Sequence, residues 1–96
     1  MRVISKRKLR EFWEQFPEAK EPLLDWYNVT RKAFWQNLVE TRDSFRHADP
    51  VGDCTVFNIK GNDYRLVAAV HYNRGFMYVR FVGTHREYDR IDAEEI

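Results

Sequence analysis

The chain has 96 residues, of which 44% are hydrophobic and 16% aromatic, and its formal net charge is +1. This length predicts a single domain, residues 1–96, and the apolar content excludes an intrinsically disordered chain. The single cysteine, Cys54, excludes an internal disulfide and is expected to be a buried, inert thiol in a reducing compartment. No apolar segment approaches the ~20 residues of a membrane span, and none follows the basic N-terminus as a signal peptide requires. We therefore expect a cytoplasmic protein.

The N-terminal third has the pattern of a short strand followed by two helices. Val3–Ile4 are β-branched, and an amphipathic helix with Ser5 as its N-cap is expected after them. The apolar positions of this helix are Leu9, Phe12, Trp13 and Phe16. Pro17 ends it, and a second helix is expected over residues 19–36, where Pro22 falls in the first turn and needs no N–H partner. The apolar stripe of the second helix is Leu23, Trp26, Tyr27, Thr30, Ala33 and Phe34.

The rest of the chain predicts a connector, three strands and a short helix. Residues 37–52 mix charges with an Asp-Pro-Val-Gly turn signal, so we expect an irregular connector. β-Branched and aromatic residues then dominate three expected strands, 55–59, 64–72 and 76–82. Gly61–Asn62 predicts a two-residue hairpin turn, and residues 73–75 contain the second turn. The expected fold is α+β, with two N-terminal helices packed on an antiparallel meander and a short helix closing the chain.

Strand parity divides the expected sheet into two faces. With Gly61–Asn62 at the tip, Ile59 opposes Tyr64 and Asn58 opposes Arg65. The apolar face then holds Phe57, Ile59, Tyr64, Leu66, Ala68, Val70, Met77, Val79 and Phe81. The other face is expected to be mostly polar and to hold Asn58, Lys60, Asp63, Arg65, Val67, His71, Tyr78, Arg80 and Val82. Such a face is either the ordinary solvated side of an antiparallel sheet or a surface for RNA phosphates and bases.

Basic residues are concentrated at the start of the chain. The first ten residues contain Arg2, Lys6, Arg7, Lys8 and Arg10 and no acid. This cluster is either a solvated helix face or part of an RNA footprint that includes Lys6 and Lys8. Charge alone does not decide between the two.

Residues 78–89, YVRFVGTHREYD, form the most informative segment. Thr84 and Glu87 have the Thr-x-x-Glu spacing of a capping box, which predicts a helix start at Thr84. The unpaired N–H groups of a helix start offer a site to a phosphate, with His85 at its head and Tyr88 one turn later. By itself, a histidine at a helix start is either an ordinary surface residue or part of such a phosphate-handling site.

The chain resembles the HigB family of bacterial toxins, within the RelE-like superfamily. The resemblance is carried by MRVISKRKLREFWEQFP, VFNIKGNDYRLV and YVRFVGTHREYD, and it extends over nearly the whole chain. It implies a toxin of a type II toxin–antitoxin pair that cuts mRNA on the translating ribosome. It also implies an antiparallel sheet flanked by two N-terminal helices, and a HigA-like helix-turn-helix antitoxin as protein partner.

The resemblance assigns roles to particular residues. Arg65 matches the strand arginine that binds phosphate in RelE-like toxins, and His85 falls where relatives place a catalytic arginine or histidine. Lys60 resembles the basic residues that relatives position beside the reacting nucleotide. Tyr88 stands for a tyrosine that lies further along the last helix in RelE-type sequences. The chain lacks the dense lysines of RelE, so the general base is not assigned. Candidate RNA contacts are Asn58, Tyr78 and Arg80.

The implied reaction is transesterification, in which a 2′-hydroxyl attacks the adjacent 3′-phosphate and expels a 5′-hydroxyl. It requires proton removal, charge stabilisation and protonation of the leaving oxygen, which side chains can supply without a cofactor. Three scattered histidines and one cysteine show no ligand spacing, so no metal is expected. One alternative is a non-catalytic RNA- or ribosome-binding module that uses the same face. The other is a structural domain whose polar face meets only a protein.

Overall fold

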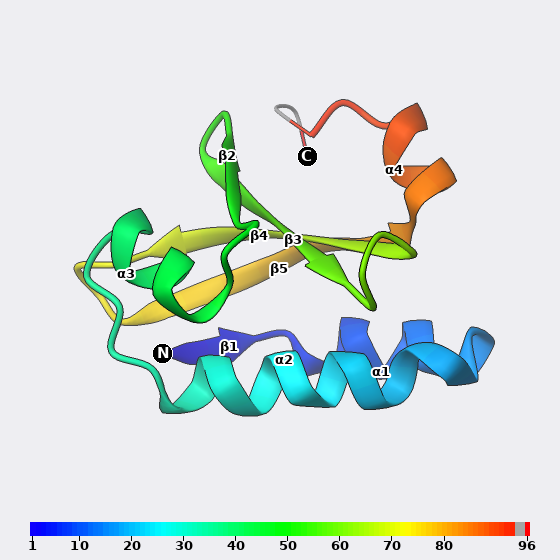
Figure 1. Ribbon diagram of the computed structural model, residues 1–96, viewed down its shortest axis with the longest axis horizontal. Helices are drawn as coiled ribbons and strands as arrows, with labels where there is room; N and C mark the ends of the chain where they lie inside the picture. The colour runs from blue at the N-terminus through cyan, green and yellow to red at the C-terminus, as the bar shows by residue number, and fades with distance from the viewer. Residues whose placement is uncertain (94–95) are drawn as a thin grey trace.

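A single sheet lies at the centre of the computed structural model, which describes residues 1–93 and 96. Within those residues, five strands are arranged in the order β1-β5-β4-β3-β2, and α1 and α2 lie side by side against one face (Figure 1). The strands are β1 (Arg2–Ile4), β2 (Asp49–Val51), β3 (Cys54–Ile59), β4 (Tyr64–His71) and β5 (Phe76–Thr84). The helices are α1 (Lys6–Gln15), the 3₁₀ turn η1 (Pro17–Ala19), α2 (Lys20–Lys32), α3 (Leu38–Ser44) and α4 (His85–Arg90). The predicted α+β fold with two N-terminal helices on the sheet is confirmed.

The first strand makes the sheet mixed rather than purely antiparallel. β1 pairs in parallel with β5, with Arg2 beside Phe76 and Ile4 beside Tyr78. The expected short strand is therefore confirmed, and its position shows why it is short: the chain must leave the sheet to start α1. Ser5 occupies the N-cap of α1, but its side chain makes no capping hydrogen bond. Beyond β1, α1 lies beside the remainder of β5.

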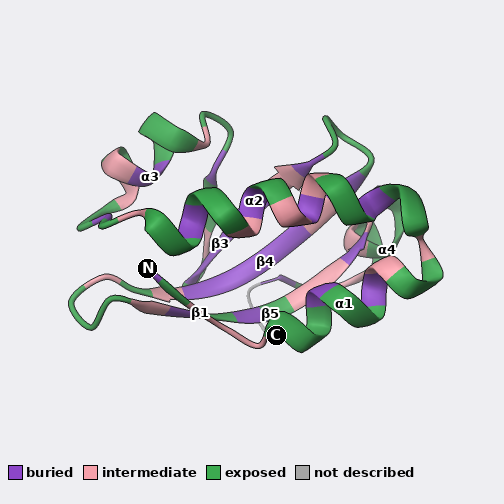
Figure 2. Cartoon of the chain, turned by 90° about the horizontal axis from the view of Figure 1, so that it is seen from below, coloured by how far each residue is buried: buried purple, intermediate pink, exposed green. Residues whose placement is uncertain are grey.

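The main core lies between the two helices and the covered face of the sheet. Figure 2 shows β4 buried along most of its length, while the outer sides of α1 and α2 are exposed. The core includes Leu9, Phe12, Leu23, Trp26, Phe57, Ile59, Tyr64, Leu66, Ala68, Met77 and Val79. Trp26 meets Phe57 edge-on with ring centroids 5.4 Å apart. Burying each large side chain stabilises the fold by about 1.5–3 kcal/mol, so this face holds the sheet and helices together.

The β3–β4 hairpin has the predicted register. Ile59 opposes Tyr64 and Asn58 opposes Arg65, and the N–H of Asp63 donates to the carbonyl of Lys60 at 3.2 Å. The apolar face predicted for these two strands is also confirmed, because its members pack into the main core.

The second helix is shorter than predicted. α2 ends at Lys32 because Ala33 has extended backbone angles, with φ −82° and ψ 154°. Phe34 is consequently 90% exposed, so its prediction as part of the apolar stripe of this helix is wrong. Trp35 is buried in its place, and its ring N–H donates to Ser44 Oγ at 3.2 Å.

The segment predicted as an irregular connector contains α3 and β2, so that prediction is wrong. Asn37 caps α3, because its side-chain oxygen accepts from the N–H of Glu40 at 2.9 Å. The hydroxyls of Thr41 and Tyr72 are hydrogen-bonded at 2.9 Å, which ties α3 to the end of β4. A helix of this length is marginal by itself and depends on such tertiary contacts, which a local pattern does not reveal.

A β-bulge interrupts the pairing of β4 with β5. Val67 opposes Phe81, whereas the next residue of β4 opposes Val79, so Arg80 is an extra residue on the β5 side. The alternation of β5 therefore shifts at this point. Phe81 packs on the uncovered face, the side of the sheet opposite α1 and α2, and Val82 packs against the main core. The predicted faces of Phe81 and Val82 are both wrong, because one inserted residue reverses every side chain beyond it.

Candidate functional site

The face of the sheet opposite α1 and α2 carries an apolar cluster at its centre, so the prediction of a mostly polar face is wrong there. The buried members are Cys54, Val56, Val67 and Ala69, and Val51, Phe81 and Tyr88 pack against them. Tyr88 comes from α4, which lies above this face in Figure 1. The thiol of Cys54 is buried, as predicted, and burial raises its pKa while the charge of Arg80 opposes the shift. The polar side chains of this face lie at its two ends.

A cleft of about 640 Å³ opens at the end of this face where β4 begins. Its polar lining residues are Arg42, Arg46, His47, Asp49, Asn58, Arg65 and Tyr88. The structure thus brings together three of the predicted site residues, Asn58, Arg65 and Tyr88. The other basic lining residues come from the last turn of α3 and the turn after it. The sequence pattern does not assign them to a site, because it predicts an irregular connector there, although the Arg-Asp-Ser-Phe-Arg-His run of residues 42–47 is a basic signal.

The charges around the cleft favour an anion. Three arginines line it against a single carboxylate, that of Asp49. Arg42 is held in place, because its Nε donates to the carbonyl of Ala48 at 2.8 Å and its Nη2 lies 3.9 Å from Asp49 Oδ1. Guanidinium groups remain cationic and their geometry matches phosphate oxygens. The cleft therefore has the charge and the donors that a phosphodiester requires.

Arg65 is anchored at the hairpin while it lines the cleft. Its Nη1 donates to the carbonyl of Asn62 at 3.1 Å and to that of Tyr64 at 3.2 Å. These bonds use one of three guanidinium nitrogens, all of which carry donors. The hairpin carbonyls thus orient the Arg65 side chain, and these two bonds do not use its Nε or Nη2.

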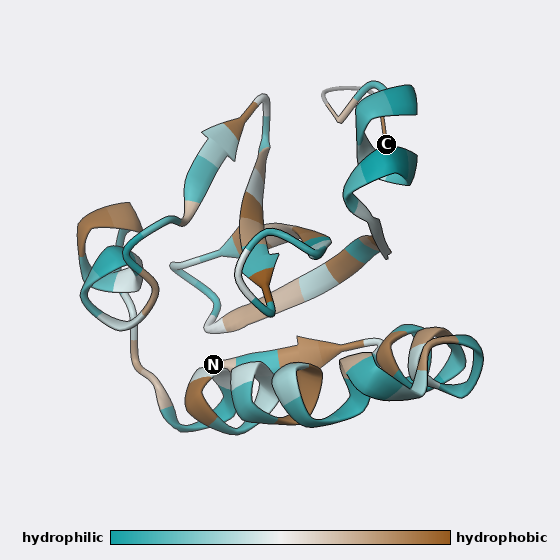
Figure 3. Cartoon of the chain, turned by 45° about the vertical axis from the view of Figure 1, so that its right-hand side comes forward, coloured by the Kyte–Doolittle hydropathy of each residue, from teal (hydrophilic) through white to brown (hydrophobic). Residues whose placement is uncertain are grey.

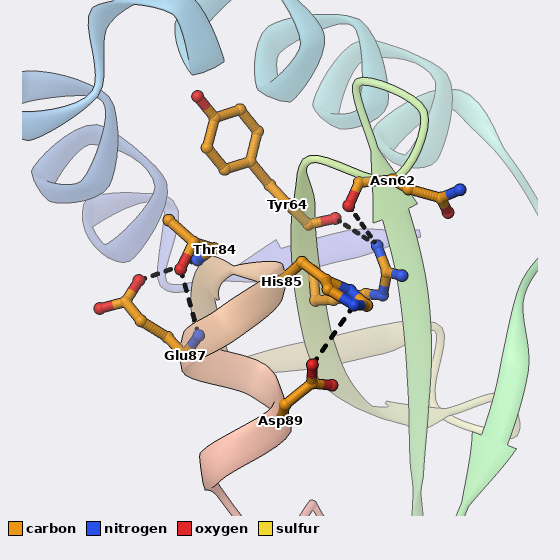
Figure 4. A network of polar contacts seen from close by, with 7 residues as sticks. Asn62, Tyr64, Thr84, His85, Glu87 and Asp89 are labelled. Atoms are coloured by element: carbon orange, nitrogen blue, oxygen red, sulfur yellow. Dashed lines mark hydrogen bonds and ion pairs between the residues drawn. The ribbon is translucent and has the colours of Figure 1, made fainter.

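His85 also contacts this hairpin turn, but it lines a different cavity from Arg65. Its backbone N–H donates to the carbonyl of Asp63 at 3.0 Å, and its side chain lines a second cavity, of about 500 Å³, with Asn62 and Tyr64. Its Nε2 lies 3.3 Å from Asp89 Oδ2, one helical turn later (Figure 4). A carboxylate at this distance orients the imidazole ring. The structure does not place His85 and Arg65 in one cavity, but it bonds both to the turn over residues 60–63.

The predicted capping box at the start of α4 is confirmed. Thr84 Oγ1 accepts from the N–H of Glu87 at 3.1 Å, and the N–H of Thr84 donates to Glu87 Oε1 at 2.8 Å (Figure 4). Together with the bond from His85 to Asp63, these contacts occupy three backbone N–H groups at the helix start. The prediction that this start offers unpaired N–H groups to a phosphate is therefore wrong for these three groups, so side chains would supply most of the contacts to a phosphate. Figure 3 shows α4 hydrophilic over its length.

Lys60 lies at the tip of the β3–β4 hairpin, outside the two cavities. Its backbone has a positive φ of 53°, in the left-handed region. Its Nζ lies 3.7 Å from Asp63 Oδ2, and both side chains are about half exposed. An exposed ion pair of this kind contributes little to stability, so Lys60 is able to exchange Asp63 for another anion.

The remaining predicted RNA contacts are divided between two places. Arg80 and Lys8 line a cavity of about 280 Å³ between β5 and α1, and the guanidinium carbon of Arg80 lies 5.6 Å from the ring centroid of Tyr78. Lys6 lies apart from this cavity, because its Nζ is 4.6 Å from the ring centroid of Tyr27 in the helical layer.

Two features are absent from residues 1–93 and 96. These residues contain no group of three or more histidine, cysteine, aspartate or glutamate side chains placed to hold a metal ion. Nor does this part of the chain include a helix long and apolar enough to cross a membrane.

Comparison with known proteins identifies the family of this chain. Residues 19–91 match a family model described as HigB toxin, the RelE-like toxic component of a toxin–antitoxin system. The mRNA interferase toxin HigB of Escherichia coli strain K12 is 30% identical over 99 residues, covering 97% of this chain and 92% of the relative. The mRNA interferase HigB of Escherichia coli O6:H1 strain CFT073 is 24% identical, covering 95% and 91%. The chain therefore belongs to the HigB family of toxins, and the resemblance seen in its sequence is confirmed.

Proposed function

We propose that the protein is an mRNA endoribonuclease, the toxin of a toxin–antitoxin pair, and that it cuts messages on the ribosome in the cytoplasm. The observation that carries this proposal is the cleft, where Arg65 and Tyr88 meet three further basic side chains, Arg42, Arg46 and His47. The names of the relatives, mRNA interferases, support the same substrate.

The proposed reaction is a transesterification at a phosphodiester held in the cleft. The 2′-oxygen loses its proton and forms a bond to phosphorus, while the bond from phosphorus to the 5′-oxygen breaks and that oxygen gains a proton. The products are a 2′,3′-cyclic phosphate and a 5′-hydroxyl end. Arg65 stabilises the charge that develops on the phosphate oxygens, and Lys60 adds to it by exchanging Asp63 for RNA.

Two histidines are available for the two proton transfers. His85 is oriented by Asp89 and is the primary candidate, and His47 lines the cleft itself. Tyr88 and Asn58 complete the cleft as contacts to the reacting nucleotide. The mechanism requires no metal or cofactor, because the three chemical tasks are assigned to side chains.

The outer RNA contacts extend away from the cleft. Tyr78 and Arg80 continue along the uncovered face, and Lys8 lies beside Arg80. Lys6, over Tyr27 in the helical layer, would meet only a longer RNA segment or the ribosome.

A second candidate function is a non-catalytic RNA- or ribosome-binding module. The observation that favours it is that His85 and Arg65 line different cavities. In that case Arg65→Ala would weaken binding, while His85→Ala would change little.

Growth arrest and message cleavage on induction test the two functions against each other. We expect wild-type protein to arrest growth and to produce cuts within translated messages, mapped by primer extension. Arg65→Ala should lower the cleavage rate by about 10²–10³-fold, and His85→Ala by about 10²–10⁴-fold. Arg31→Ala is the matched control, since it removes a cation from α2 without touching the cleft. Wild-type protein that arrests growth without cutting translated message would leave the binding module as the function.

We also propose a HigA-like helix-turn-helix antitoxin as the protein partner. The family description of a toxin–antitoxin system supports an antitoxin of some kind. Co-expression with the product of a neighbouring short reading frame should restore growth and yield a complex that co-purifies. Failure of every neighbouring product to restore growth would contradict this assignment.

A further inference from the structure

At the end of the uncovered face away from the cleft, three side chains form a ring cluster: His71, Phe76 and Tyr78. The ring centroids are 5.0 Å apart for His71 and Phe76, 5.3 Å for Phe76 and Tyr78, and 5.9 Å for His71 and Tyr78. The two pairs that include Tyr78 meet edge to face, with interplanar angles of 87° and 83°. Arg80 lies over the Tyr78 ring, so the cluster carries a cation at its border.

The ring cluster is at the surface although its rings are fixed. His71 and Phe76 are directly opposed in the β4–β5 ladder, and Tyr78 pairs with Ala69. Tyr78 is 37% exposed and His71 is exposed, while the core begins on the opposite side of the sheet. Mutual ring contacts therefore hold these side chains in place, and they leave aromatic surface open to a ligand.

The cluster shares its face with the cleft. Arg65 and His71 are six residues apart on β4 and have the same parity, which separates them by about 20 Å along the strand. The apolar cluster of the uncovered face lies between the two. A single RNA strand lying along this face would thus meet arginines at one end and rings at the other.

We propose that the ring cluster is a stacking platform for unpaired bases of the RNA, with Arg80 bound to the backbone beside them. None of the four side chains is acidic, and sheet aromatics bordered by a cation are the surface that single-stranded RNA uses in sheet-based binding modules. The inference rests on the proposed function, because it names a second contact of the same RNA several nucleotides from the cleavage position. It gives His71 and Phe76 a function in RNA binding, although neither side chain takes part in the proposed reaction or in the main core.

The test is a titration of labelled protein with a short 2′-O-methyl RNA oligonucleotide, followed by NMR of the aromatic side chains. This RNA cannot be cut, because the attacking hydroxyl is blocked, so binding is measured apart from catalysis. We expect the ring signals of Phe76 and Tyr78 to shift upfield on stacking. Tyr78→Leu should weaken binding by about five-fold or more, whereas Tyr78→Phe should retain it. Phe34→Ala is the matched control, because it removes an exposed ring outside the cluster.

Removal of single bases from the same oligonucleotide locates the contact. An abasic position several nucleotides from the one in the cleft should weaken binding to the wild type but not to Tyr78→Leu. RNA that shifts signals at Arg65 but leaves the rings unmoved would overturn the platform and leave the proposed function intact. RNA that shifts no signal would also overturn the platform, while the cleavage assay decides the proposed function separately. Rings that respond to the antitoxin and not to RNA would make the cluster a protein contact and overturn the inference.

Discussion

The two faces of the sheet can be compared within one strand, because β4 contributes alternately to each. On the covered face, Tyr64, Leu66 and Ala68 are at most 4% exposed and all pack into the main core. On the uncovered face, Arg65 lines the cleft, whereas Val67 is fully buried in the smaller cluster. The covered face is thus uniform, while the uncovered face is stabilising at its centre and open to ligands at its ends.

This difference shows how one sheet can hold a small domain together and still present polar side chains at its surface. Polar side chains at the ends of a strand remain hydrated, so they cost little in stability. The same charges at the centre would be desolvated and would have to be paired. The four changes below test the division, from the largest expected effect to the smallest.

Leu66→Ala should have the largest effect on stability. Leu66 is fully buried in the main core, so we expect the free energy of unfolding to fall by about 2–5 kcal/mol in urea denaturation. Arg65→Ala, the neighbouring change on the other face, should alter it by less than about 1 kcal/mol while abolishing most cleavage. Equal destabilisation by both changes would contradict the division of the two faces.

Tyr64 makes the covered face sensitive to alkaline pH. Burial, the 2.8 Å hydrogen bond to Glu18 and the nearby carboxylates raise its pKa to about 12. Below about pH 10 the phenol is protonated in the folded and unfolded states alike, so its contribution is constant. Between about pH 10 and 12 only the unfolded state loses the proton, so stability should fall by up to about 2–3 kcal/mol.

Urea denaturation at pH values below and within this window measures the Tyr64 effect. Tyr64→Phe should remove most of the decline, because the remaining tyrosines are more exposed. A variant that loses stability with rising pH as steeply as the wild type would show that another group is responsible.

Val67→Ala tests whether the centre of the uncovered face is packed. The side chain is fully buried among Val56, Phe81 and Tyr88, so we expect a loss of about 1–2 kcal/mol. Thermal unfolding monitored by circular dichroism is suitable, with Val51→Ala at the partly exposed edge of the cluster as the control. A negligible effect would mean that this face is an ordinary solvated surface along its whole length.

Thr84→Ala should have the smallest effect on stability, about 1 kcal/mol, because it removes one half of the capping box. Its effect on cleavage should be larger than this loss implies, since His85 is the next residue and depends on the same helix start. Thr84→Ser should restore both properties, because its hydroxyl accepts the same hydrogen bond. Normal cleavage by a stable Thr84→Ala protein would show that the reaction does not depend on the helix cap.

The sequence predicts those parts of the fold that local chemistry specifies. The hairpin register follows from Gly61–Asn62, and the start of α4 follows from the spacing of Thr84 and Glu87. Arg65 and Tyr88 were recognised as candidate site residues by the motifs around them, and the structure brings these two into one cleft.

The parts that were missed depend on contacts between distant segments. α3 is held by the hydrogen bond of Thr41 to Tyr72, so its basic residues were not assigned to the cleft. The bulge at Arg80 arises only from the pairing of β5 with β4, and the sequence of β5 by itself does not predict it. Phe34 satisfied the helical spacing, but α2 ends before it.

The bulge makes Arg80 an insertion in an otherwise regular strand. If it were removed, Val79 would be followed by Phe81 and Val82, and strict alternation would be restored with every remaining side chain on its present face. Arg80 is therefore the one residue of β5 that the sheet does not use in its ladder. Shortening the strand at this point should give a protein that folds as before but lacks the cation beside Tyr78.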